Sequence, residues 1–100
     1  MKLGILVNSN KNLDAIVGLT ESAVEREHEV TLFIMDEGTH LLEENSFCSL
    51  AESSQVNMSY CEHSAVDLGV DTSHLTEAIE SSSQYNNAAM NHNMDKVVVL

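Results

Sequence analysis

The chain has no tryptophan and no proline, and only four of its 100 residues are aromatic. Its core must therefore be built mainly from aliphatic side chains. A chain of this length buries only about 60–65% of its unfolded surface, which is adequate for one small domain. We expect a single domain over residues 1–100, with a modest core that self-association would help to stabilise.

Positive charge is also scarce. Four Lys and Arg residues stand against 16 Asp and Glu residues, which gives a formal charge of −12 with neutral histidines. Such a surface repels phosphate backbones and anionic lipids, so nucleic-acid and membrane partners are disfavoured. The simplest interpretation of the acidity is solubility, and the alternative is a preference for basic partners.

Long apolar runs are missing as well. The run at residues 3–7 is too short for a signal peptide and has no small-residue cleavage site after it. No stretch approaches the about 20 apolar residues of a membrane span. We therefore expect a cytoplasmic protein, in which Cys48 and Cys61 are free thiols rather than a structural disulfide.

Short apolar runs alternate with helix-like patterns through the chain. From Leu13 to Val24, apolar residues recur at the spacing of one helix face. Residues 36–38 are expected to form a loop, and short helical pieces are expected around Leu41 and Leu42 and over 47–51. Apolar runs typical of buried strands occupy residues 3–7, 30–35 and 97–100, and a third, shorter strand is expected over 56–60. This alternation predicts an α/β fold with a mostly parallel sheet and helices on both faces.

The pattern after the third strand is less regular. Ser64 is expected to cap a short helix that ends near Leu68, with Gly69 as its left-handed stop. Residues 70–82 fit either a helical turn or a short edge strand. Ser83 is a reasonable N-cap for a further helix. One face of that helix would carry Tyr85, Ala88, Ala89 and His92.

Chemistry in parallel sheets collects at the carboxyl ends of the strands. Three loops lie there, at residues 8–10, 36–39 and 61–64. Asn8 and its neighbours form a candidate phosphate loop, but the loop lacks the Gly-rich character that brings several N–H groups onto one anion. A helix cap is the simpler interpretation, and a flavodoxin-like cofactor binder is the weaker alternative.

Cys61 is the leading candidate for chemistry, because it ends a strand and precedes a short helix. Backbone N–H groups and the positive end of the helix dipole favour the nucleophilic thiolate there. His63 would support that thiolate if the loop curls back, whereas Glu62 and the acidic surface oppose it. A buried, inert cysteine is the competing interpretation.

The other cysteine and the histidines carry weaker signals. Cys48 is expected to be a small core residue, and a redox pair with Cys61 lacks the Cys-x-x-Cys spacing. Cys48, Cys61, His63 and His74 do not have metal-ligand spacing, so no metal and no cofactor are expected. His28, His40 and His92 are expected to be exposed or half-buried, and His74 is ambiguous.

Residues 59–70, SYCEHSAVDLGV, resemble the DsrE/DsrF-like (TusD-like) sulfur-relay family. That family places a cysteine at the end of its third strand, ahead of a Gly-aliphatic pair, and Cys61 with Gly69-Val70 fits this pattern. Residues 5–8, 30–38 and 95–100 are similar to the family's first strand, second strand with its loop, and last strand. The resemblance thus covers nearly the whole chain.

The resemblance implies a three-layer α/β/α fold with a five-stranded, mostly parallel sheet, assembled into trimers or hexamers. In the sulfur-relay branch, the matching cysteine accepts sulfur as a persulfide and passes it to another protein's thiol. This gives Cys61 a sulfurtransferase-like role, with Asn8, His63 and Ser64 as possible support. Some relatives have a second cysteine where this chain has Ser64, and others lack the cysteine altogether. A non-catalytic assembly or small-ligand binding subunit is therefore the alternative.

Overall fold

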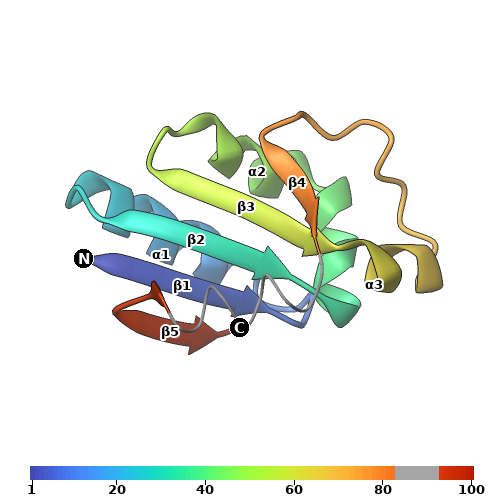
Figure 1. Ribbon diagram of the computed structural model, residues 1–100, viewed down its shortest axis with the longest axis horizontal. Coiled ribbons are helices and arrows are strands. Elements are labelled where there is room, and N and C mark those ends of the chain that lie inside the picture. The colour runs from blue at the N-terminus through green and yellow to red at the C-terminus, as the bar shows by residue number, and fades with distance from the viewer. Residues whose placement is uncertain (83–92) are drawn as a thin grey trace.

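Figure 1 shows the computed structural model of the protein, which describes residues 1–82 and 93–100. Five strands form one sheet in the order β4-β3-β2-β1-β5, and every strand pair is parallel. The strands are β1 (Lys2–Val7), β2 (Glu29–Ile34), β3 (Val56–Cys61), β4 (Ile79–Ser82) and β5 (Lys96–Val99). The predicted α/β fold with a mostly parallel, five-stranded sheet is confirmed.

Helical segments connect the strands. They are α1 (Leu13–Glu25), the 3₁₀ helix η1 (Asp36–Glu43), α2 (Asn45–Cys48), the 3₁₀ helix η2 (Ser49–Glu52) and α3 (Glu62–Asp67). In Figure 1, α1 and α2 lie behind the sheet, and α3 lies beyond the arrowheads of the strands. The carboxyl ends of β1, β2 and β3 therefore meet near α3, and this end of the sheet is the place to look for a site.

The main core lies between the sheet and the helices behind it. Strand register aligns Val7, Ile34 and Tyr60 in one row across the sheet, and all three are buried. Ile16 on α1 and Phe47 on α2 are fully buried in the same cluster. Each such side chain contributes about 1.5–3 kcal/mol when it leaves water. This core fixes the strand positions, and through them the carboxyl edge.

Two predictions about helix starts are wrong. Helix α1 begins at Leu13 with Asn12 in the N-cap position, so residues 8–10 do not cap it. Instead, the hydroxyl of Ser9 accepts a hydrogen bond from the Lys11 N–H at 3.2 Å, within the preceding turn. Ser64 lies inside α3 rather than at its start, because β3 runs one residue further than predicted and Cys61 takes the N-cap position.

The loop expected at residues 36–38 is the first turn of η1. Gly38 makes this possible, since a Cβ at that position would lie 2.4 Å from the Val7 carbonyl oxygen. The glycine lets η1 pack directly on the end of β1. Local propensity could not reveal this helix, because the contact that supports it joins residues about thirty positions apart in the chain.

The remaining boundaries follow the sequence pattern more closely. Gly69 has φ +68°, so the predicted left-handed stop after α3 is confirmed. Residues 70–82 end in the edge strand β4, one of the two predicted alternatives. The expected helix with Ser83 as its cap lies outside the described residues. Within residues 1–82 and 93–100, the helices are too short or too polar to cross a bilayer.

Candidate functional site at the carboxyl edge of the sheet

A polar cleft of about 610 Å³ opens where β1, β2 and β3 end. Its walls come from the loop after β1, from the start of η1 and from α3. The lining residues are Asn8, Asp36, Glu37, His63, Ser64, Asp67 and Leu68. The structure thus brings three of the four predicted site residues, Asn8, His63 and Ser64, to one place, together with three carboxylates that give the rim its charge.

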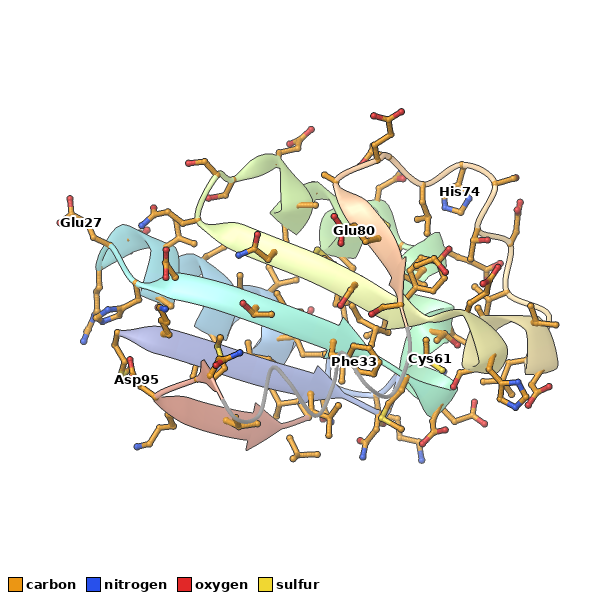
Figure 2. All side chains as sticks on the ribbon, in the orientation of Figure 1. Glu27, Phe33, Cys61, His74, Glu80 and Asp95 are labelled. Carbon is orange, nitrogen blue, oxygen red and sulfur yellow. The ribbon has the colours of Figure 1, made fainter. Side chains whose placement is uncertain are left out.

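Cys61 lies beside this cleft, on the other face of the sheet from the main core. Successive residues of a strand point to opposite faces, and Tyr60 belongs to the main core, so the Cys61 side chain points the other way. There it packs against Phe33, with Leu6, Met35 and Met94 around the pair. Figure 2 shows Phe33 and Cys61 next to each other at the ends of β2 and β3.

Cys61 is enclosed, as its competing interpretation expected. The residue is only 5% exposed, and it is not among those that line the cleft. The residues that surround the thiol come from β1, from the end of β2 and from the segment before β5. The structure therefore places the thiol at the expected end of the sheet, but inside an apolar cluster rather than at its mouth.

The surface around α3 is acidic. His63 is 84% exposed, and its Nε2 lies 3.2 Å from an Asp67 carboxylate oxygen, one helical turn away. This pairing turns the imidazole along α3. Glu62 occupies the first turn, and its carboxylate accepts a hydrogen bond from the Ser81 hydroxyl at 3.3 Å. α3 has only six residues, so its dipole adds little to offset these charges.

The second thiol lies in a different environment, which the sequence did not reveal. Cys48 donates its S–H to the Leu42 carbonyl oxygen at 3.1 Å, and His74 donates its Nε2–H to the same oxygen at 3.0 Å. Desolvation by burial raises the pKa of the Cys48 thiol. Both side chains line a groove of about 500 Å³ whose walls include Leu75. The His74 hydrogen bond also fastens the segment before β4 to η1.

The described part of the chain contains no ready-made metal site. No group of three or more His, Cys, Asp or Glu side chains gathers there in a way that could hold a metal ion. Cys48 and His74 share one carbonyl oxygen, while Cys61 belongs to a separate apolar cluster and His63 pairs with Asp67. The four residues considered together from the sequence are thus divided among three environments.

Comparison with known proteins identifies the fold. The structure of the ychN protein from E. coli matches all of this chain and all of its own, with a TM-score of 0.79 and 19% sequence identity. The structure of MTH1491, a protein of unknown function from Methanobacterium thermoautotrophicum, matches with a TM-score of 0.78 and 9% identity. That match covers 99% of this chain and 98% of MTH1491.

Sequence comparison adds nothing to this likeness. No protein-family model matches the chain, and no curated protein matches it. Both of these structures have the DsrE/YchN fold. The protein therefore has the DsrE/YchN-like α/β fold, as the resemblance of its strands and of the Cys61 region implied.

Proposed function

We propose that the protein is a sulfur-relay protein in which Cys61 carries sulfur as a persulfide. The Cys61 thiolate attacks the outer sulfur of a donor persulfide, and the S–S bond of the donor breaks. The donor leaves as a thiolate, which takes up a proton. One S–S bond breaks and one forms, so the exchange is redox-neutral. An acceptor thiolate then removes the outer sulfur from Cys61 by the same step, which makes the activity sulfurtransferase-like.

The placement of Cys61 supports this proposal most directly. The thiol ends the third strand of a DsrE/YchN-like sheet, at the edge where the polar cleft opens. Its apolar neighbours Phe33, Leu6, Met35 and Met94 would keep water and oxidants from a bound persulfide. Because the residue is 5% exposed, we expect transfer to require a local opening that a docked donor or acceptor protein stabilises.

Mass spectrometry of the intact protein tests the proposal. After incubation with a persulfide donor, we expect one added sulfur atom on the wild-type chain and on Cys48→Ser, and none on Cys61→Ser. Cys48→Ser is the matched control because it removes the only other thiol. An unmodified wild-type protein, or an adduct that persists in Cys61→Ser, would contradict the proposal.

A second candidate function is a non-catalytic assembly or small-ligand binding subunit with the same fold. The burial of Cys61 favours it, since an enclosed thiol also serves simply as a small core side chain. Under this alternative, iodoacetamide alkylates Cys61 no faster than a model thiol at any pH. Cys61→Ser would also leave assembly and partner binding unchanged.

Assembly and location complete the proposal. A homo-oligomer, as a trimer or hexamer, fits both candidate functions, with a donor or acceptor protein as the further partner of the relay. We place this activity in the cytoplasm, where free thiols persist. Sedimentation analysis of the purified chain measures the oligomer directly.

A further inference from the structure

Among residues 1–82 and 93–100, strand β5 forms one edge of the sheet, and its one neighbour strand is β1. Leu100 donates its N–H to the Leu6 carbonyl at 2.8 Å, and its own carbonyl accepts from Asn8 at 3.2 Å. The backbone of Leu100 therefore faces β1. Hydrogen-bonding direction alternates along a strand, so Val98 also faces β1 and the backbone groups of Val97 and Val99 face outward.

Apolar surface gathers at the same edge. Three large apolar side chains stand exposed in the described part of the chain, and two of them are here: Val99, 57% exposed, and Met1, 58% exposed. Met1 lines a groove of about 270 Å³ between α1 and β5, together with Leu3, Leu19 and Val98. An outward-facing backbone edge next to an apolar groove is a template for strand pairing.

Charge makes this edge the favourable face for a second copy of the chain. With a formal charge of −12, most of the surface repels another copy. The groove beside β5 has no carboxylate among its lining residues, but it includes Arg26 and Lys96, two of the four Lys and Arg residues in the sequence. Asp95 at the start of the edge balances part of this positive charge. Repulsion between like surfaces is therefore weakest here.

We propose that β5 pairs antiparallel with β5 of a second copy across a two-fold axis, so that two sheets become one. The axis passes at Val98, which faces the second copy's Val98. The outward backbone groups of Val97 then bond to those of the second copy's Val99, and the reverse pair forms by symmetry. Each groove between α1 and β5 is covered by the partner. A hexamer with two-fold axes is compatible with this contact.

Sedimentation velocity of a matched pair of variants tests the surface. Val99→Lys places charge at the pairing edge, whereas Val66→Lys makes the same change at a valine that is 71% exposed on α3. We expect the dissociation constant of the two-fold contact to rise at least about tenfold for Val99→Lys. We expect no change for Val66→Lys. A wild-type chain that stays monomeric at millimolar concentration, or equal effects of both variants, would overturn the proposal.

Disulfide trapping tests the register. In a chain whose own cysteines are replaced by serine, Val98→Cys lies opposite itself across the axis, in a non-hydrogen-bonded pair whose Cα separation of about 4.5 Å permits a disulfide. Mild oxidation should therefore cross-link Val98→Cys into covalent dimers. Val99→Cys faces the second copy's Val97 and should cross-link far less. Equal cross-linking of both variants, or none, would exclude this pairing.

Discussion

Gly38 is the residue at which one added carbon has the clearest consequence. A Cβ there would lie 2.4 Å from the Val7 carbonyl oxygen, which is backbone and cannot swing aside. We expect Gly38→Ala to lower the free energy of unfolding by about 1–3 kcal/mol, as overpacking does. Urea denaturation measures the change.

Gly18 provides the control for that variant. A Cβ at Gly18 has no neighbour within 4 Å, and the residue lies inside α1. Gly18→Ala should therefore raise the free energy of unfolding by about 0.5–1 kcal/mol, because alanine favours the helix. If both variants shift stability in the same direction, the close approach of η1 to β1 is not the constraint described here.

Cys48 gives the protein a pH dependence in the alkaline range. Burial raises the pKa of its thiol in the folded state, so the unfolded chain loses this proton first. The contribution of the protonated Cys48 thiol to folding stability is complete below the pKa of a free thiol, about 8.5. It is lost as the pH rises through the pKa of this thiol in the folded protein. We expect the stability of the wild-type chain to fall more steeply above about pH 8.5 than that of Cys48→Ser.

The serine variant is a close control, because its hydroxyl can also donate to the Leu42 carbonyl but does not titrate in this range. The quantity to compare is the slope of the unfolding free energy against pH, since the two variants also differ in side-chain volume. Identical slopes would mean that the Cys48 thiol ionises as easily in the folded protein as in the unfolded chain.

The positions and contacts of single side chains near the site could be predicted from the sequence only in part. That Cys61 lies at the end of the third strand follows from the strand predicted directly before it, and this position is confirmed. Its burial against Phe33 and Met94 depends on which side chains cross that face of the sheet, and these come from distant segments. The His63–Asp67 pair follows from helical spacing, but only once α3 is known to begin at Glu62.

At the scale of elements, buried strands are the most predictable part of the chain. The first three predicted strands lie within one residue of β1, β2 and β3, because buried strands carry apolar side chains, nearly continuous in β1 and alternating with Asn57 and Ser59 in β3. Strand β4 is only four residues long and carries one buried side chain, Ile79, so its pattern is too weak to separate from a helical turn. The 3₁₀ helix η1 owes its position to Gly38 packing on β1, which no local pattern encodes.

The two edge strands of the sheet differ in how readily they pair with another chain. β4 carries the exposed Glu80, whereas β5 presents Val97 to Val99 with Lys96 at its start. A charged residue within an edge strand discourages pairing with another chain, and a valine-rich edge permits it. The two edges of this sheet are therefore unequal, and the asymmetry selects β5 as the contact for a second copy.

The charge of the whole molecule acts on its stability as well as on its partners. A formal charge of −12 is confined to a fold with a radius of gyration of 12.2 Å, so the carboxylates repel one another more in the folded than in the unfolded chain. Salt screens this repulsion, since the Debye length falls from about 30 Å at 0.01 M to about 8 Å at 0.15 M. We expect the free energy of unfolding to rise with NaCl over this range and then level off.

Glu80→Lys separates this effect from general actions of salt. The substitution changes the formal charge by two units, from −12 to −10, at an exposed position on β4. It should stabilise the protein at low salt and weaken the dependence on NaCl, because less repulsion remains to be screened. A salt dependence that is as steep in Glu80→Lys as in the wild-type chain would point to ion binding or to a hydrophobic effect of salt. The acidity of the molecule would then cost the fold little, and its consequence would lie in the choice of partners.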